Sequence, residues 1–341
     1  MPGIRRMGRE IFTKPELAAL AALRARFLDG TSAGGGYWKN EAELALYDAS
    51  FGERIGWKWD GVLAELNARG WRPSAKHIVD WGCGSGVAGR RVLAAWEDFE
   101  SLTLTDVSPL AMRFAEMRAR ENFPRLGLRT AAHATAAVAG SLLLVSHVLN
   151  ETDDAAAHRL IGAARRAAEI IWVEAGTHAD SRRLISVREE LRGEFDIIAP
   201  CTHAARCGML TAENAAHWCH HFATVPSEAS RDARWAQFGR ELGIDMRSLP
   251  YSFLVLARRG MSAHFEKQTQ GCSRIIGRPR DEKGHFNVLS CGEEGVEELM
   301  AQKRDVPELS KQLRKGRADA VQRWTREGRR ITGATALNSA D

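Results

Sequence analysis

The sequence predicts an α/β fold built on a mainly parallel β-sheet with helices on both faces. From His77 onward, short apolar runs typical of strands alternate with segments of helical periodicity, which is the pattern of βαβ units. A glycine-rich turn follows the first of these strands and reads Asp80-x-Gly82-x-Gly84-x-Gly86. With 341 residues, of which 44% are hydrophobic and 27% charged, the chain is long enough for two or three compact units with sizeable cores.

The region before the first strand predicts helices. Thr13 can cap a first helix, whose apolar residues recur at helical spacing. The glycines at residues 34–36 break the chain, a second helix is expected after Asn40, and a third is expected over residues 59–67. These helices can either cover a ligand pocket or dock a partner, and the sequence does not distinguish the two roles.

The alternating region predicts six strands and four helices. The expected strands are residues 77–81, 102–105, 128–133, 142–147, 170–174 and 252–257. The expected helices are residues 87–96, 109–122, 155–168 and 181–191. No apolar run approaches the roughly 18 uninterrupted residues that a membrane helix requires, so no membrane span is expected.

The turn after the first strand has the properties of a nucleoside-binding pocket. Glycines pass such a tight turn easily, and their missing side chains let a ligand lie against the backbone before the next helix. The spacing differs from the G-x-G-x-x-G dinucleotide fingerprint and resembles the first motif of Rossmann-like class I methyltransferases. That resemblance implies an S-adenosylmethionine site formed by Gly82, Gly84 and Gly86, with Asp80 holding the methionine end of the cofactor.

Two further segments are expected at the same pocket. Asp106 ends the second strand, where an acid accepts the ribose hydroxyls in related nucleoside-binding folds. Asn150 and Glu151 follow the fourth strand, at the carboxyl edge where open α/β sheets bind ligands. His147 is a candidate general base, but a histidine in such a strand is more often packed and hydrogen bonded, and we favour that interpretation. The sequence therefore assigns no catalytic residue.

A second signature is a cysteine-rich segment at residues 199–222, which contains Cys201, Cys207 and Cys219. Clustered cysteines in an intracellular chain more often bind metal or catalyse than form disulfides. A fourth sulfur is available from Cys272 or Cys291, and four thiolates suit either an iron-sulfur cluster or structural zinc. A mixed zinc site is also open, because the segment contains His203, His217, His220 and His221.

The Pro200-Cys201 pair has an alternative interpretation as a catalytic nucleophile. Cytosine-5 methyltransferases attack their base with a cysteine that can sit in a Pro-Cys pair. Cys201 lies about 25 residues past the fifth expected strand and near two more cysteines, which favours a metal ligand. Cys83, inside the glycine turn, is expected to be a small filler residue.

Several short segments between residues 172 and 291 share the pattern of one known family. They are Trp172–Thr177, Ala199–Cys207, His217–His220, Tyr251–Phe253, Arg278–Arg280, Gly284-His285 and Leu289–Cys291. On these segments the chain resembles the methyltransferase-like assembly proteins of the mitochondrial small ribosomal subunit and their bacterial relatives. The resemblance implies a four-iron four-sulfur (4Fe-4S) cluster on Cys201, Cys207, Cys219 and Cys291, which leaves Cys272 free. It also implies binding to the small ribosomal subunit and its rRNA, with an S-adenosylmethionine pocket whose catalytic use is open.

The end of the chain is basic. The net charge is +5, and residues 303–330 contain ten Lys and Arg against four Asp and Glu. Such a segment suits phosphate backbones, because each cation that meets a phosphate releases a condensed counterion, although a solvated helix face is the simpler alternative. Residues 273–277 and 285–289 predict a hairpin that brings Cys291 back toward the rest of the chain.

These observations predict three regions: a helical region at residues 1–75, an S-adenosylmethionine-binding domain at residues 76–260, and a C-terminal hairpin with a basic helical tail at residues 261–341. The leading hypothesis is a small-subunit assembly factor, with or without rRNA methyltransferase activity. The alternative is a small-molecule methyltransferase with structural zinc. We expect a bacterial cytoplasmic protein, and the alternative is the mitochondrial matrix. The arginines of residues 1–10 are typical of a mitochondrial transit peptide, but the early acids Glu10 and Glu16 are not.

Overall fold

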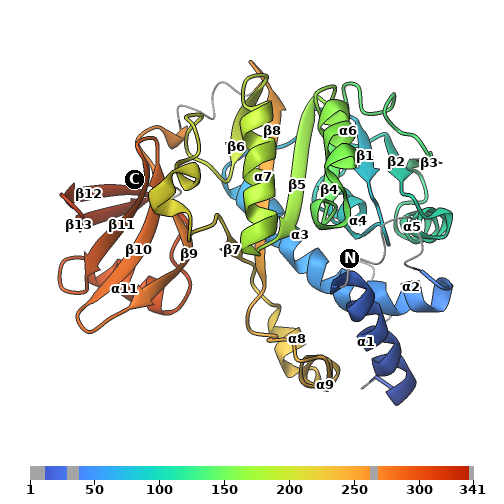
Figure 1. Cartoon of the computed structure of the whole chain (residues 1–341), viewed down its shortest axis with the longest axis horizontal. Helices are drawn as coiled ribbons and strands as arrows, with labels where there is room; N and C mark the ends of the chain where they lie inside the picture. Colours follow the sequence, from blue (N-terminus) through green and yellow to red (C-terminus); the bar gives the residue numbers. More distant parts are fainter. Residues whose placement is uncertain (1–11, 29–37, 262–267, 338–341) are drawn as a thin grey trace.

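A computed structural model describes residues 12–28, 38–261 and 268–337. An α/β domain forms its centre, helices from the N-terminal region pack below it, and a β-barrel stands to one side (Figure 1). The arginines near the start of the chain and the expected glycine break at residues 34–36 lie outside the described residues.

The N-terminal region is helical, as predicted. Its elements are α1 (Lys14–Leu28), α2 (Glu41–Tyr47), a π-helical turn η1 (Asp48–Gly52) and α3 (Glu53–Ala68). Asn40 caps α2 by accepting the backbone N–H of Glu43 at 2.9 Å, and Thr13 and Glu16 form a capping box at the start of α1. Helix α3 begins six residues earlier than predicted because η1 leads directly into it.

The central sheet is mixed. Its strands are β1 (His77–Trp81), β2 (Ser101–Thr105), β3 (Gly127–Thr130), β4 (Leu142–Ser146), β5 (Glu169–Ala175), β6 (Phe195–Ala199), β7 (His221–Phe222) and β8 (Pro250–Arg258). The order is β3-β2-β1-β4-β5-β8-β6, with β7 paired to β8. Strands β1 to β5 pair in parallel, and β8 is antiparallel to β5 and β6. This is the Rossmann-like sheet of class I methyltransferases, and its order reverses between β1 and β4, where such sheets bind ligands.

Helices cover both faces of the sheet. They are α4 (Val87–Ala95), α5 (Pro109–Asn122), α6 (Asp154–Ala164) and α7 (His178–Leu191). Two further helices, α8 (Ser227–Arg231) and α9 (Ala233–Leu242), lie below the sheet and pack with α1 and α3 (Figure 1). Adjacent residues of β1 enter different cores: Ile78 packs with residues of α3 and α4, and Val79 packs with residues of α6 and α7. Burial on both faces explains why the central strands read as continuous apolar runs.

All six expected strands and all four expected helices are present, with ends shifted by a few residues. In the central domain the prediction missed β6, the two-residue β7 and the helices α8 and α9. Strand β6 is only five residues long and contains Asp196, whose carboxylate accepts the backbone N–H of Gly260 at 2.9 Å. Helix α9 is short and polar, and its apolar face packs against α1 and α3, so tertiary contacts stabilise it.

The C-terminal region is a closed barrel rather than a hairpin with a helical tail. Its elements are β9 (Ser273–Asp281), β10 (His285–Gly292), β11 (Gly295–Gln302), α11 (Pro307–Arg314), β12 (Val321–Glu327) and β13 (Arg330–Ala336). The hairpin prediction is confirmed by the antiparallel pairing of β9 with β10. Barrel order is β10-β11-β13-β12-β9, with a parallel β11-β13 pair and a helix between the third and fourth strands. This is the arrangement of an OB-fold.

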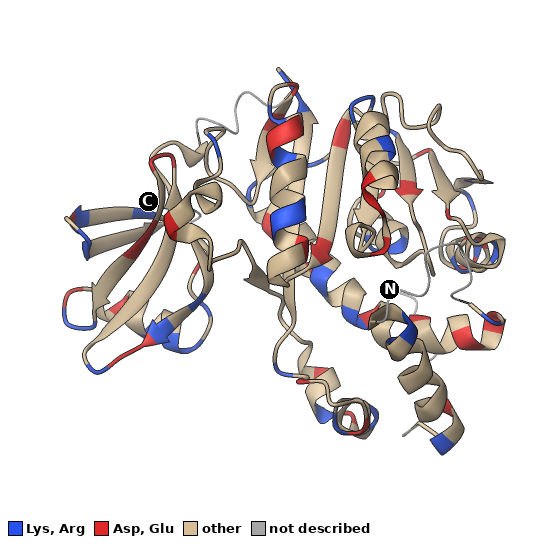
Figure 2. Ribbon diagram, viewed as in Figure 1, with Lys and Arg blue, Asp and Glu red and all other residues tan. Residues whose placement is uncertain are grey.

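The expected basic tail is part of this barrel because its apolar residues fill the interior. Val321 and Ile331 are buried, and the Trp324 indole N–H donates to Ser290 Oγ at 2.9 Å. Acidic and basic residues are interspersed over the ribbon of the barrel (Figure 2). Six of the ten basic residues form ion pairs: Lys303, Arg304, Lys311, Arg314, Arg326 and Arg330. The positive field of this segment is therefore weaker than its composition predicts.

No helix in the part of the chain that the structure describes is long and apolar enough to cross a membrane.

Candidate cofactor and metal sites

A cavity of about 610 Å³ lies at the carboxyl ends of β1, β2 and β4. Its wall includes Trp81–Ser85 after β1, Thr105–Val107 after β2 and Ser146–Val148 after β4. These three segments meet where the strand order reverses, which is the ligand-binding position in open α/β sheets. The volume is in the range of cofactor pockets, about 300–1,000 Å³.

In the glycine turn, the main chain itself forms part of the cavity wall. Gly82 has φ of +66°, and a Cβ there would lie 2.7 Å from a methyl group of Val148. Gly84 has φ of +50°, and a Cβ on it would meet no other atom within 4 Å, so this residue leaves open space at the wall. Gly86 lies outside the cavity lining and packs against Ala115 of α5.

The two expected acids have different positions. Asp106 lines the cavity and accepts the backbone N–H groups of Gly84 at 2.9 Å and Ser108 at 2.8 Å. Asp80 does not line the cavity: it is fully buried beneath the turn, where Oδ2 accepts the Gly89 N–H at 3.0 Å. Burial raises the pKa of Asp80 to about 7. Asp80 therefore holds the turn from below, whereas Asp106 is accessible to a ligand.

The segment after β4 contributes His147, which lines the cavity with a positive φ of 57°. Its Nε2 lies 2.9 Å from the Nζ of Lys58 on α3, and its Nδ1 faces Ser146 Oγ at 3.4 Å. Burial lowers the pKa of Lys58 to about 8 and lowers that of His147 well below its ordinary value. Both ring nitrogens have neighbours within the protein, which agrees with a packed histidine. Glu151 also lines the cavity, whereas Asn150 is exposed outside it.

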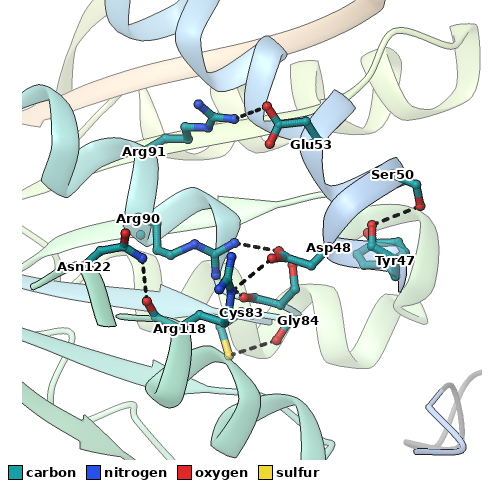
Figure 3. A network of polar contacts seen from close by, with 12 residues as sticks. Tyr47, Asp48, Ser50, Glu53, Cys83, Gly84, Arg90, Arg91, Arg118 and Asn122 are labelled. Carbon is teal, nitrogen blue, oxygen red and sulfur yellow. Dashed lines mark hydrogen bonds and ion pairs between the residues drawn. The ribbon is translucent and has the colours of Figure 1, made fainter. Parts of the chain in front are cut away.

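The N-terminal helices cover this cavity, which is one of the two roles that the sequence left open. Phe27, Trp38 and Tyr47 line it. Figure 3 shows Asp48 of η1 between two arginines, Arg90 of α4 at 2.6 Å and Arg118 of α5 at 3.4 Å. These ion pairs fasten the helical cover beside the glycine turn.

Gly82→Ala is expected to weaken binding of S-adenosylhomocysteine about tenfold or more, measured by calorimetry. A left-handed conformation costs a non-glycine residue about 1–2 kcal/mol, and the new methyl group would displace Val148 from the wall. Gly193→Ala is the matched control, because its Cβ would meet nothing within 4 Å. Equal affinities in the two variants would contradict a role of this turn in cofactor binding.

A second, small cavity of about 30 Å³ lies between the central domain and the barrel. Four cysteines line it: Cys201 after β6, Cys207 before the turn η3 (Gly208–Leu210), Cys219 before β7 and Cys291 on β10. The remaining wall is largely apolar and includes Ile185, Met209 and Phe253. Segments separated by 90 residues of sequence therefore bring four thiols to one buried site.

The shared cavity raises the pKa values of three of its thiols. The pKa of Cys207 is raised to about 11, mainly by burial and to a smaller extent by the negative charge of the Cys201 thiolate. Burial and neighbouring cysteines likewise raise the pKa values of Cys219 and Cys291. Four thiolates at this site consequently require a cationic partner.

Of the other candidate ligands, His203 and His221 lie beside the cavity, with Nε2 atoms 3.7 Å from the sulfurs of Cys291 and Cys219, whereas Cys272 and His220 lie elsewhere. Cys272 does not line the cavity; its sulfur accepts from Arg323 at 3.7 Å. His220 stacks on Trp218, and the described residues contain no group of three or more His, Cys, Asp or Glu that could hold a single metal ion. Cys201 lines this second cavity and not the cofactor cavity, so its position does not suit a nucleophile for methyl transfer.

Beside the cysteines lies a buried ion-pair network that the sequence gave no sign of. Arg274 of β9 donates two bonds to Glu65 of α3, at 2.6 and 2.8 Å, and a third to the carbonyl of Pro200 at 3.2 Å. Arg69, the residue after α3, donates to Glu65 at 2.6 Å and to the carbonyl of Ile198 at 2.8 Å. The network joins the N-terminal helices, the segment before Cys201 and the barrel.

Comparison with known proteins gives structural neighbours and one family. No curated protein matches the sequence. The magnesium protoporphyrin IX methyltransferase ChlM of Synechocystis PCC 6803, solved with bound SAM, is 14% identical with a TM-score of 0.37, covering 71% of this chain and 97% of its own. The 16S rRNA methylase RmtB is 15% identical with a TM-score of 0.36, covering 73% and 76%. The model of the family described as mitochondrial small ribosomal subunit Rsm22 matches residues 61–322, so the chain belongs to the Rsm22 family.

Proposed function

We propose that this protein is an assembly factor of the small ribosomal subunit that binds S-adenosylmethionine and carries a 4Fe-4S cluster. The observation that carries the proposal is the convergence of Cys201, Cys207, Cys219 and Cys291 on one buried cavity, in a chain of the Rsm22 family. The family description names the mitochondrial small ribosomal subunit, and this supports a role where such subunits are assembled. The word mitochondrial in that description supports the mitochondrial alternative over the bacterial cytoplasm.

The donor set favours a cluster over zinc. Four cysteines line the cavity, and four thiolates are the usual ligand set of a 4Fe-4S cluster. A 4Fe-4S cluster takes one thiolate at each of four iron atoms, so its ligands stand farther apart than those of a single zinc ion. When bound, it supplies a one-electron redox couple. The four cysteines would tie the central domain to the barrel through it, because Cys291 belongs to β10 and the other three do not.

The large cavity supports binding of S-adenosylmethionine. Asp106 would accept the ribose hydroxyls, and the backbone at Gly82 and Gly84 would lie against the ligand. Asp80 and Gly86 would act indirectly, by holding the turn. The protein need not turn the cofactor over to use it, because ordering the helical cover around a bound ligand can itself shape a partner surface.

Four exposed cations of the barrel segment support contact with rRNA: Lys315, Arg317, Arg323 and Arg329. No ion pair with another described residue engages them, in contrast to the six paired cations. An OB-fold is a frequent platform for nucleic acid. Few contacts to phosphate predict a modest salt dependence, which reversal of these four charges should remove.

The decisive test is sedimentation of anaerobically purified protein with immature and mature small ribosomal subunits, in the presence of methyl-labelled S-adenosylmethionine. We expect migration with the immature particle. Label in its rRNA would establish methyltransferase activity, and migration without label would establish an assembly factor that binds cofactor without turnover. Failure of cluster-loaded protein to migrate with either particle would contradict the proposal and leave a small-molecule methyltransferase.

A further inference from the structure

Each sulfur of the cysteine cavity has an N–H donor or a histidine nitrogen beside it. Arg188 Nε lies 3.3 Å from Cys201, His221 Nε2 lies 3.7 Å from Cys219, His203 Nε2 lies 3.7 Å from Cys291, and the backbone N–H of Met209 bonds to Cys207. Such contacts matter because hydrogen bonds to ligand sulfurs set the reduction potentials of iron-sulfur clusters. For a histidine, the contact is a donor only if the facing nitrogen carries the proton.

The proton position on His221 follows from its other neighbour. Arg274 Nε–H donates to His221 Nδ1 at 3.3 Å, so Nδ1 must present its lone pair. A neutral imidazole then carries its proton on Nε2, the nitrogen that faces Cys219. His221 is buried, and its ring packs against Tyr251 and Phe253 with centroid distances of 5.8 and 5.1 Å, so the ring is held in this orientation.

Arg274 has little freedom to release this bond. Its guanidinium is held in place by Glu65 and by the Pro200 carbonyl, and the side chain is buried. The planar fork of arginine allows Nε to point at His221 while both terminal nitrogens bind elsewhere. A relay Glu65–Arg274–His221–Cys219 thus runs from α3 through the barrel to one of the sulfurs.

We propose that Arg274 is a positioning residue that fixes the Nε2–H tautomer of His221, so that this N–H donates to Cys219 and raises the reduction potential of the cluster. The inference rests on the cluster of the proposed function. The donated proton draws charge from the sulfur and stabilises the reduced, more negative cluster. Because Arg274 belongs to β9, the potential depends on whether the barrel is docked on the central domain.

The test is the midpoint potential of the cluster in the full-length protein carrying Arg274→Lys. Lysine keeps a positive charge opposite Glu65 but lacks both the Nε–H that donates to His221 and the planar guanidinium that binds two partners at once. At a fixed solution potential we expect the ratio of reduced to oxidised cluster to fall about tenfold. This corresponds to a midpoint potential lower by about 59 mV for a one-electron couple. His221→Phe keeps an aromatic ring but no donor and should shift the potential in the same direction. Arg278→Lys is the matched control, because Arg278 lies on the same strand over the Phe222 ring.

Two failures are distinguishable. Absence of iron and sulfide from the wild-type protein would contradict the proposed function itself. Normal cluster content with unchanged potentials in both variants would overturn only the role of Arg274. If a variant loses its cluster, the tautomer of His221 can still be measured by NMR of the ring nitrogens in metal-free, histidine-labelled protein. We expect the Nε2–H tautomer in the wild type and a mixture in Arg274→Lys, and an Nδ1–H tautomer in the wild type would overturn the proposal.

Discussion

Cys201→Ser is expected to lose the bound iron and sulfide, lower the melting temperature and weaken binding to small-subunit rRNA. A serine oxygen is a poor replacement for a thiolate, and loss of the cluster removes a cross-link between the central domain and the barrel whose formation is coupled to folding. Removal of a comparable cross-link, a native disulfide, costs about 2–5 kcal/mol. A loss of this size corresponds to a decrease of roughly 10 °C in a domain of 150–250 residues, at about 2–4 °C per kcal/mol.

The effect should reach the barrel because the cysteine cavity is part of its interface with the central domain. A Cβ on Gly208, next to Cys207, would lie 2.8 Å from the backbone nitrogen of Val296 on β11, so the two units are in close contact. Loss of the centre therefore loosens the surface that carries Lys315, Arg317 and Arg329.

Cys272→Ser is the matched control, since Cys272 is also buried but lies outside the cavity. Iron and sulfide are measured on anaerobically purified protein, unfolding by circular dichroism, and affinity by filter binding to small-subunit rRNA. A Cys201→Ser protein with wild-type iron content, melting temperature and affinity would contradict the assignment. A Cys272→Ser protein with the same losses would indicate that general destabilisation, rather than loss of a ligand, is responsible.

Local sequence patterns predicted the central domain well because its strands and helices follow one another as βαβ units. Between His77 and Ala175 three of the four strand pairs join consecutive strands, and only the β1-β4 pair skips two strands. The same logic brought Asp106 and the segment after β4 to the cavity, since both end parallel strands at the same edge.

The sequence was less informative for residues whose positions depend on contacts with residues far away in the sequence. Residues 303–330 were expected to form a basic helical tail, because charge dominates their composition and only a short stretch around Val321 and Trp324 has the alternating pattern of a strand. The barrel interior that buries these apolar residues exists only after β9 and β10 have paired. Similarly, Lys58 and Glu65 are single charges in an amphipathic helix, and their partners His147 and Arg274 lie 89 and 209 residues away.

Glu65→Gln is expected to lower the free energy of unfolding at pH 7 by about 3–5 kcal/mol. The substitution leaves Arg274 and Arg69 buried without a counter-charge, and an unpaired buried charge is costly. Glu121→Gln is the matched control, because Glu121 forms an exposed pair with Arg118 on α5 and should change stability by less than about 1 kcal/mol. Urea unfolding of the cluster-loaded proteins measures both.

The acid dependence gives an independent check on the same residue. Burial alone would raise the pKa of Glu65, but Arg274 and Arg69 outweigh it and lower the pKa from 4.5 to about 2. Because the folded-state pKa is depressed, the stabilisation is fully present above pH 4.5 and is lost as the pH falls from 4.5 toward 2. At 1.36 kcal/mol per pKa unit, the shift corresponds to about 3 kcal/mol. The difference between wild type and Glu65→Gln should therefore shrink across this interval, and a difference that stays constant with pH would contradict the ion pair as the source of stability.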